Sequence, residues 1–243
     1  KGVRLRDLLK KAGVEADAVQ VRLNGLEQGV VAATPDFVKA IDIDLAQMPD
    51  VVVAYAMNGE ALPLLNGFPI RLVVPGYFAT YWVKMLDDIE VINKVDENFW
   101  MKPAYRIPVG IFPIRDRFLT QEDATSTPIT EIVVNSLITS HRDGAKVKAG
   151  KVTLAGMAWD GGYGISRVEV STDGGKTWSA AKLGEDLGKY ALRAWSFDLS
   201  VKRGKTSVMV NATNVIGQTQ VSKLLFNGAG YHNNVMQNIT LNA

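Results

Sequence analysis

At the start of the chain, the hydrophobic residues are spaced as in a helix, and this spacing changes farther along. Leu5, Leu8, Leu9 and Ala12 recur at intervals of three and four residues, and Gly13 follows them. This spacing places the apolar side chains on one face of a helix, and a glycine commonly ends one. We therefore predict a short amphipathic helix that begins at residue 2 or 3 and stops at Gly13.

Two apolar runs farther along are separated by turn signals. Residues 51–57 (VVVAYAM) are rich in β-branched side chains, and Asn58-Gly59 follows them directly. Residues 70–74 form the second run, which Pro75-Gly76 ends. Strands on either side of an Asn-Gly turn commonly pair, so we predict paired β-strands here. Residues 19–23 (VQVRL) alternate and predict a further strand.

Two other segments of the first half give mixed signals. Phe37, Ile41 and Leu45 recur every four residues, so the segment around them predicts a short helix or a structured loop. Residues 82–95 (WVKMLDDIEVINKV) are amphipathic in a way that fits either a helix or a strand. We therefore expect an α+β fold for the first half of the chain.

The second half carries β signals at short spacing. A polar stretch that is typical of a linker, Thr120–Thr130, precedes it, so we predict one domain over residues 1–125 and a second over 126–243. About seven short strands over about 100 residues is the pattern of an all-β immunoglobulin-like sandwich. The predicted strands are 130–137, 151–159, 166–171, 178–183, 193–199, 206–213 and 218–224.

Composition narrows the class of protein. Of the 243 residues, 47% are hydrophobic and 21% are charged, so the chain can bury a core and is not disordered. The longest uncharged apolar run, 51–57, is far shorter than the roughly 20 residues of a membrane-spanning helix, so no membrane span is predicted. With 27 basic and 25 acidic residues, the charge is too balanced to indicate a nucleic-acid partner.

The chain is poor in metal-binding side chains. It contains no cysteine and two histidines, which excludes disulfides, thiolate zinc sites, cysteine nucleophiles and a three-histidine zinc site within these residues. Asp87, Asp88 and Glu90 are interpreted as a solvated face, because no other hard ligands cluster with them. We therefore predict no metal-ligand set among these residues.

Two stretches of the first half resemble a known family. Residues 55–71 (YAMNGEALPLLNGFPIR) are followed by 72–76 (LVVPG) and 81–84 (YWVK). They resemble the molybdopterin domain of the sulfite oxidase family, in which a Tyr-x-Met-Asn-Gly turn precedes His-Gly-x-Pro-x-Arg, Val-Pro-Gly and x-Val-Lys. Residues 99–105 (FWMKPAY) are similar to the family segment in which a tryptophan precedes a substrate-pocket tyrosine by five residues.

A third stretch extends the resemblance to the second half. Residues 141–144 (HRDG), 156–159 (GMAW) and 168–178 (VEVSTDGGKTW) are similar to the family's C-terminal sandwich, whose DGG-x-x-W hairpin is distinctive. The resemblance implies an incomplete α+β molybdopterin domain followed by an immunoglobulin-like sandwich. Because no haem domain is fused, the chain is most similar to the molybdopterin subunit of a bacterial sulfite dehydrogenase.

The resemblance implies a molybdenum-molybdopterin cofactor and assigns residues to it. Arg71 would grip the pterin phosphate bidentately, and Lys84 would add a point charge. Backbone groups of Trp82 and Val83 would meet the same ligand. Without the resemblance, Arg71 would be interpreted as a solvated arginine of a strand and Lys84 as a surface lysine.

Three further candidates follow from the resemblance. Asn66 stands where the family has a histidine, and its amide cannot take up a proton near neutral pH. Glu27 stands where the family has an aspartate near the pterin, which keeps the charge and moves it by one methylene. Tyr105 is the catalytic candidate, a hydrogen-bond donor in the substrate pocket; alternatively it is an aromatic side chain at the edge of the core.

The implied activity is the oxidation of sulfite to sulfate at an oxo-molybdenum centre, with electrons passed to a c-type cytochrome. No Cys-x-x-Cys-His motif occurs in the chain, so we expect the cytochrome to be a separate protein and the location to be the periplasm. Lys94, Lys102 and Arg106 are candidate surface charges for docking it, although each alone would be interpreted as a solvated cation.

The family binds molybdenum through a cysteine thiolate, which this chain lacks. In the family that cysteine lies upstream of the segment that residues 2–9 resemble, so we expect a missing N-terminal part and a longer subunit. Two alternatives need no metal. One is a binding or adhesion module that uses the face of the sandwich, and the other is a structural remnant that assembles with another chain.

Overall fold

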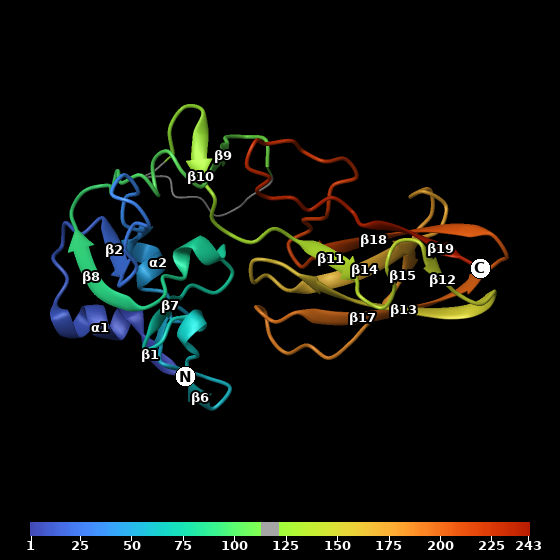
Figure 1. Cartoon of the computed structure of the whole chain (residues 1–243), viewed down its shortest axis with the longest axis horizontal. Coiled ribbons are helices and arrows are strands. Elements are labelled where there is room, and N and C mark those ends of the chain that lie inside the picture. The colour runs from blue at the N-terminus through green and yellow to red at the C-terminus, as the bar shows by residue number, and fades with distance from the viewer. Residues whose placement is uncertain (113–121) are drawn as a thin grey trace. The chain divides into compact units, whose positions relative to one another are not determined.

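A computed structural model describes residues 1–112 and 122–243 of the chain (Figure 1). The chain divides into two compact units, Lys1–Glu131 and Ile132–Ala243. The predicted boundary after residue 125 falls shortly before this division. Each unit has its own core, which we describe in turn.

The predicted linker is part of the first unit for most of its length. Within Thr120–Thr130, residues 120 and 121 lie outside the described residues. Strand β10 (Ser126–Pro128) pairs antiparallel with β9 (Arg106–Pro108), so that Thr127 lies opposite Ile107. Part of this polar stretch therefore belongs to a strand that pairs within the first unit.

Two three-stranded antiparallel sheets and two hairpins hold the strands of the first unit. Besides β9 and β10, these strands are β1 (Gly2–Arg4), β2 (Gln20–Gly25), β3 (Val38–Asp42), β4 (Val52–Ala54), β5 (Ala56–Met57), β6 (Glu60–Ala61), β7 (Arg71–Val73) and β8 (Leu86–Ile92). One sheet has the order β1-β4-β7, and the other has the order β3-β2-β8. Strand β8 settles the mixed signal of residues 82–95 in favour of a strand.

The predicted pairing of the two apolar runs is confirmed. Strands β4 and β7 pair antiparallel, with Val53 opposite Leu72. The Asn58-Gly59 turn, however, closes the small β5–β6 hairpin, in which Met57 lies opposite Glu60. The predicted turn is therefore confirmed, but it connects shorter strands than the apolar runs indicate.

The helices of the first unit are short. They are α1 (Leu5–Ala12), α2 (Ile43–Ala46) and the 3-10 helices η1 (Leu64–Asn66) and η2 (Ala79–Tyr81). Helix α1 ends at Gly13 as predicted, but it begins at Leu5 because the three residues before it pair with β4. Within the described residues, no helix has the length and apolar character that a membrane span requires.

The segment around Ile41 forms a strand where its spacing favoured a helix or loop. Residues 38–41 of β3 are all buried, because both faces of the strand are covered. Only one helical turn, α2, follows. The four-residue spacing of Phe37, Ile41 and Leu45 is thus shared between a strand and a short helix, and pairing with β2 outweighs the local pattern.

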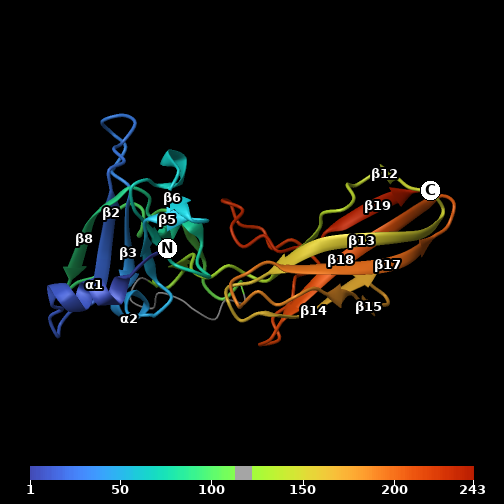
Figure 2. The same ribbon diagram turned by 90° about the horizontal axis from the view of Figure 1, so that it is seen from below.

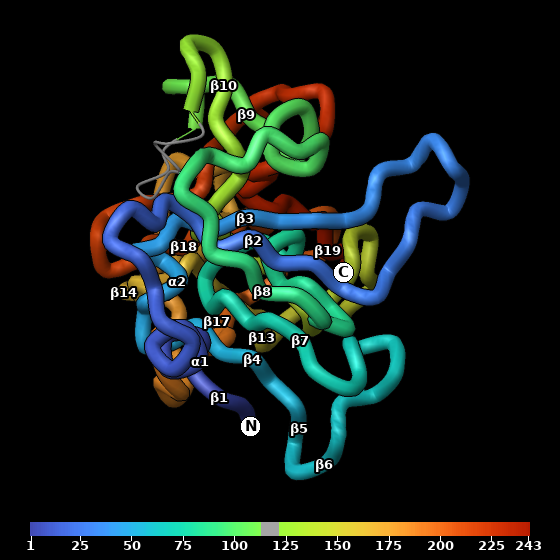
Figure 3. Tube along the Cα trace, turned by 90° about the vertical axis from the view of Figure 1, so that its left-hand side faces the viewer, coloured from blue at the N-terminus to red at the C-terminus, as the bar shows by residue number. Residues whose placement is uncertain are grey.

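The core of the first unit joins α1 to both sheets. Leu5 and Leu9 of α1, Leu23 of β2 and Leu72 of β7 are buried in it, together with Tyr81 at the end of η2. The connection between β2 and β3 extends away from this core as a long loop (Figure 2 and Figure 3). The loop carries exposed apolar side chains and the candidate residue Glu27.

The described residues of the second unit contain strands and no helix, as predicted. The strands are β11 (Asn135–Ile138), β12 (Ala145–Lys146), β13 (Gly150–Trp159), β14 (Ile165–Ser171), β15 (Ser179–Ala180), β16 (Lys182–Leu183), β17 (Arg193–Val201), β18 (Lys205–Asn214) and β19 (Asn238–Asn242). They form a four-stranded sheet, β11-β13-β17-β16, and a five-stranded sheet, β12-β19-β18-β14-β15.

One core contains buried side chains of both sheets of the second unit. Leu154 and Trp195 come from the four-stranded sheet, and Val168 and Val208 come from the five-stranded sheet. The predicted strand at 218–224 is wrong, since this segment makes only isolated bridges. Strand β19 pairs with β18 instead, and its sequence NITLN alternates polar and buried apolar residues as a half-buried strand does, although it was not among the predicted strands.

The second unit is expected to unfold cooperatively as an isolated fragment of residues 132–243. Its core is contained within these residues, so a fragment of this size should unfold with an enthalpy on the order of 70 kcal/mol. Differential scanning calorimetry of the purified fragment measures this. A broad transition without a clear enthalpy would show that the fragment needs the rest of the chain for its core.

Candidate cofactor and substrate site

Arg71 and Lys84 are brought together by strand β7 and the segment that runs beside it. The backbone N–H of Leu72 donates to the Val83 carbonyl at 2.8 Å, and the N–H of Leu86 donates to the Ile70 carbonyl at 2.9 Å. These two hydrogen bonds align residues 83–86 with β7. Two positive side chains separated by thirteen positions in the sequence thus become neighbours.

The guanidinium of Arg71 binds two loops at once. Its two terminal nitrogens donate to the carbonyls of Asn66 at 3.0 Å and Trp82 at 2.9 Å, and its Nε lies 3.4 Å from the Leu72 carbonyl. Burial lowers the pKa of Arg71 from its usual value, but an arginine remains protonated at neutral pH. Of its five N–H donors, two are left for a ligand.

Gly67 lies between Arg71 and Lys84 in a space that admits no side chain. Its φ of 101° is in the left-handed region. A Cβ at this position would lie 3.0 Å from the Cβ of Lys84 and 3.1 Å from the Cβ of Arg71. The absence of a side chain lets a ligand approach the backbone between two cations, as anionic groups such as phosphates require. The residues present therefore fit the phosphate of a molybdopterin.

Lys84 and Glu27 form an exposed ion pair at the edge of this group. The Nζ of Lys84 lies 3.8 Å from the carboxylate of Glu27 and 3.5 Å from the Leu65 carbonyl. Both side chains are more than a third exposed, at 38% and 42%, so the pair adds little to stability. Glu27 is thus placed beside the predicted cofactor cation, where it partly neutralises Lys84.

The other three cofactor candidates differ in what they contribute. Asn66 is exposed, and it offers its backbone carbonyl to Arg71 rather than its amide. The Trp82 indole donates to the Val74 carbonyl at 2.8 Å, and its ring lies 5.7 Å from the Arg71 guanidinium carbon. Val83 is 3% exposed and packs in the core. Its carbonyl accepts the Leu72 N–H, so that oxygen serves the fold.

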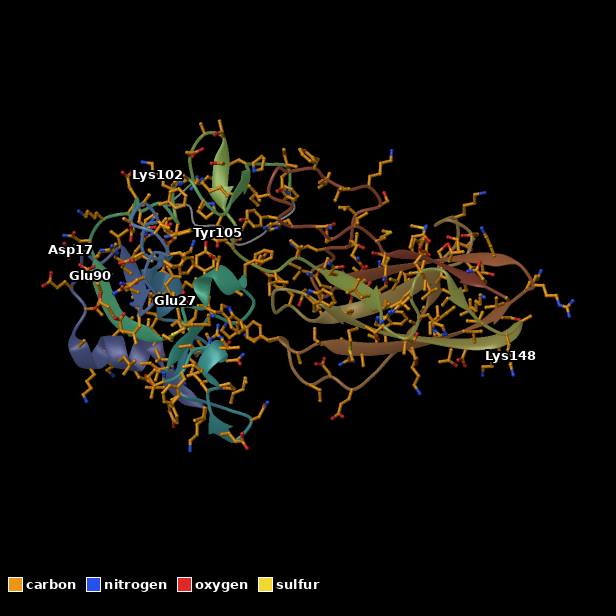
Figure 4. The ribbon with its side chains drawn as sticks, in the orientation of Figure 1. Asp17, Glu27, Glu90, Lys102, Tyr105 and Lys148 are labelled. Carbon is orange, nitrogen blue, oxygen red and sulfur yellow. The ribbon has the colours of Figure 1, made fainter. Side chains whose placement is uncertain are left out.

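Tyr105 belongs to a separate aromatic cluster of the first unit (Figure 4). Its ring centroid lies 6.1 Å from that of Trp100 and 6.4 Å from that of Phe37. Its backbone has a φ of 56°, in the left-handed region, and its carbonyl accepts the Ile129 N–H at 2.8 Å. A non-glycine residue keeps this backbone only where its surroundings fix it.

Hydrogen bonds of both its indole and its backbone hold Trp100 in place. Its indole N–H donates to the Asp36 carbonyl at 2.8 Å, and its backbone N–H donates to the side-chain oxygen of Asn98 at 2.7 Å. Asn98 in turn donates its backbone N–H to Asp96 at 2.8 Å. These side-chain oxygens cap local turns of the segment between β8 and β9.

Lys39 lies beside Tyr105 and was not among the residues that the sequence singled out. It is fully buried in β3, its Nζ donates to the Trp100 carbonyl at 2.7 Å, and it lies 5.0 Å from the centroid of the Tyr105 ring. Burial lowers its pKa to about 7, although the nearby Asp96 acts to raise it. A lysine within the apolar run FVKAI was the available signal, since lysines are rarely buried without a partner.

Known families match both units of the chain. The family model described as "Oxidoreductase molybdopterin binding domain" matches residues 1–100, and "Mo-co oxidoreductase dimerisation domain" matches residues 126–243. Mitochondrial sulfite oxidase of Homo sapiens is 36% identical over 219 residues, which are 86% of this chain and 39% of that protein. The chain belongs to the sulfite oxidase family.

Two further proteins are similar to the chain. The NADH nitrate reductase of Solanum lycopersicum is 31% identical over 266 residues, covering 100% of this chain and 29% of that protein. The crystal structure of the sulfane dehydrogenase SoxCD from Paracoccus pantotrophus matches with a TM-score of 0.83 at 26% identity. That match covers 99% of this chain and 59% of the other.

Membership of the sulfite oxidase family confirms the predicted molybdopterin domain and its molybdenum-molybdopterin cofactor. Both halves of the chain match parts of molybdenum oxidoreductases. This counts against the alternative of an adhesion module without metal. The chain spans about two fifths of the length of the mammalian sulfite oxidase that it matches, at 39%.

The three predicted docking charges do not share one environment. Lys94 and Lys102 are exposed, and Lys102 pairs with Glu97 at 2.5 Å. The side chain of Arg106 is only 10% exposed and donates to the carboxylate of Asp123 at 3.0 Å. Arg106 therefore holds the β9–β10 hairpin together and is not a free surface charge.

The first unit also has an open cleft, which Lys94 and Glu97 help to line. It has a volume of about 660 Å³ and a mainly charged lining that includes Arg22, Glu90 and Asp96. Arg22 pairs with Glu90 at 3.4 Å and with Asp96 at 3.2 Å. These charges are already paired and the cleft is open. We therefore favour the groups around Arg71 and Tyr105 over this cleft as the functional site.

Replacement of Arg71 by methionine is expected to weaken cofactor binding about 10- to 100-fold, since a hydrogen bond to a charged group contributes about 1.5–3 kcal/mol. Molybdenum and pterin contents of the purified subunit measure this loss. Arg203→Met, at an exposed position of the second unit, is the control. Full occupancy in Arg71→Met would return Arg71 to the interpretation of a solvated arginine.

Proposed function

We propose that the chain is the cofactor-binding and substrate-binding part of an enzyme that oxidises sulfite to sulfate. The observation that carries this proposal is the group formed by Gly67, Arg71 and Lys84, which presents two cations beside a bare backbone in a domain of the sulfite oxidase family. An anionic cofactor phosphate is the ligand that this group suits.

In this proposal each group has a defined task. The two free N–H donors of Arg71 hold the phosphate, and Lys84 adds a second positive charge. When bound, the molybdenum-molybdopterin supplies the two-electron oxidation. The hydroxyl of Tyr105 donates a hydrogen bond to an oxygen of sulfite, and the fixed backbone of this residue keeps the donor in place.

Other residues complete the proposed enzyme. The 243 residues contain no cysteine, so the thiolate ligand that the resemblance implies for molybdenum comes from outside them. We also propose that the two sheets of the second unit are an immunoglobulin-like sandwich. The family model that matches this unit is described as a dimerisation domain, which supports its use in assembly.

The proposed electron acceptor is a separate c-type cytochrome in the periplasm. The match to a sulfane dehydrogenase from a bacterium supports a bacterial sulfur-oxidising system, and no c-type haem motif occurs in the chain. Exposed lysines of the first unit, Lys94 and Lys102, provide positive charge for a transient encounter.

The function is tested with the molybdenum-loaded subunit that contains these residues. Sulfite-dependent reduction of cytochrome c is expected, with a rate that changes with ionic strength because exposed charges are screened by salt. Thiosulfate is tested in the same assay as an alternative electron donor, and nitrate is tested separately as an electron acceptor with a reduced dye as donor, because a sulfane dehydrogenase and a nitrate reductase are among the relatives. Turnover of thiosulfate or nitrate in place of sulfite would change the assigned substrate. If none of the three compounds is turned over, the enzyme proposal is overturned.

A further inference from the structure

Lys39 occupies a position in β3 where a lysine is costly. Its side chain has no exposed surface, and its neighbours Val38, Ala40 and Ile41 are apolar and buried. A charged amine removed from water loses several kcal/mol of solvation unless partners replace it. Within the described residues, the one hydrogen bond of its side-chain amine goes to the carbonyl of Trp100 at 2.7 Å.

Two tyrosine rings supply the rest of its surroundings. The Nζ of Lys39 lies 4.5 Å from the ring centroid of Tyr81 and 5.0 Å from that of Tyr105. These distances are in the range of cation–π attraction. The amine is therefore held between the rings of Tyr81 and Tyr105 and the carbonyl of Trp100.

The two tyrosines are also joined through Ile129. The hydroxyl of Tyr81 donates to the Ile129 carbonyl at 2.6 Å, and the Ile129 N–H donates to the Tyr105 carbonyl at 2.8 Å. Hydrogen bonds through Ile129 thus fix the backbone of Tyr105, whereas Lys39 contacts its ring. The backbone of Tyr105 has a φ of 56°, so its conformation depends on such contacts.

We propose that Lys39 is a positioning residue for Tyr105: its amine ties the Trp100 carbonyl to β3, supports the ring of Tyr105, and so sets the direction of the hydroxyl in the substrate pocket. The proposal rests on the proposed function, in which Tyr105 donates to sulfite. Since Lys39 has no exposed surface, it acts through Tyr105 and Trp100 and not by contact with the substrate.

A double-mutant cycle tests this assignment with molybdenum-loaded protein and a dye as electron acceptor. Lys39→Met keeps the length of the side chain and removes the amine. It is expected to lower kcat/KM for sulfite about tenfold in the wild-type background and less than twofold in the Tyr105→Phe background, because the hydroxyl that it positions is then absent. An equal loss in both backgrounds would overturn the proposal. Lys11→Met, at an exposed position of α1, is the control.

A second readout needs no cofactor and no activity. In protein with ¹³C-labelled tyrosine, Lys39→Met is expected to shift the ring resonances of Tyr105 and Tyr81, whereas Lys11→Met leaves them in place. Unchanged Tyr105 resonances would contradict the assignment. If Lys39→Met does not fold, nuclear Overhauser contacts between the Lys39 ε-methylene and the Tyr105 ring in wild-type protein decide the question, and their absence overturns it.

The two readouts separate this proposal from the proposed function. A wild-type protein that does not oxidise sulfite would refute the function, while the resonances of Tyr105 would still report whether Lys39 holds the ring. A protein that oxidises sulfite but shows unchanged resonances in Lys39→Met would refute the positioning role alone.

Discussion

Replacement of Tyr105 by phenylalanine is expected to lower kcat/KM for sulfite by about 100- to 1,000-fold. The change removes one hydroxyl and keeps the ring, so the contacts of Tyr105 with Trp100 and Phe37 remain. Loss of one preorganised donor at a reacting anion typically costs about 2.7–4 kcal/mol of transition-state stabilisation. Steady-state kinetics with sulfite measure the loss.

Two measurements complete this prediction. Molybdenum content should be unchanged in Tyr105→Phe, because the cofactor contacts proposed above belong to Arg71 and Lys84. Tyr190→Phe is the matched control, because Tyr190 is a partly exposed tyrosine of the second unit. An unaltered kcat/KM in Tyr105→Phe would remove Tyr105 from the catalytic machinery and leave it as an aromatic side chain of the cluster.

The burial of Lys39 leads us to expect a second large effect: the free energy of unfolding should depend on pH. Burial lowers the pKa of Lys39 from 10.5 to about 7. Below about pH 7 the lysine is charged in both the folded and the unfolded state. Between about pH 7 and 10.5 the unfolded chain binds the extra proton, so the free energy of unfolding rises with pH across this window. Because each unit of pKa corresponds to 1.36 kcal/mol, the full effect is about 5 kcal/mol, of which about 4 kcal/mol is reached by pH 10.5.

Chemical denaturation of wild type and Lys39→Met at several pH values isolates this rise. The titratable groups that face Lys39 are Asp96, Tyr81 and Tyr105, and they are present in both proteins, so their contributions cancel in the difference. The stability of wild type relative to Lys39→Met should therefore increase by about 4 kcal/mol from pH 6 to pH 10.5. A difference that stays flat would mean that Lys39 keeps an ordinary pKa.

The sequence identified the cofactor candidates because they sit in short, specific motifs. Arg71 and Lys84 were selected by the segments NGFPIR and WVK, and the structure joins these segments through the backbone bonds of Leu72 and Leu86. The glycine between them could be named from the motif, but its role required coordinates. Only the structure shows that a Cβ on Gly67 would meet both cationic side chains.

Tertiary contacts explain what the sequence could not predict. The spacing of Phe37, Ile41 and Leu45 is helical, yet pairing with β2 makes most of this segment a strand. The burial of Lys39 could not be predicted for the same reason, since it depends on Tyr81 and on a segment about sixty residues away in the chain. Motif and period report local preference, whereas the partners of a buried charge are set by the whole fold.

The two carbonyl bonds of Arg71 also bear on how rigid its surroundings are. The guanidinium binds the carbonyls of Asn66 and Trp82, so one side chain ties together the loops that precede and follow β7. A receptor that is ordered in advance loses little conformational entropy when its ligand binds. An anion that meets the remaining donors of Arg71 would therefore meet a side chain whose conformation is set by contacts within the protein.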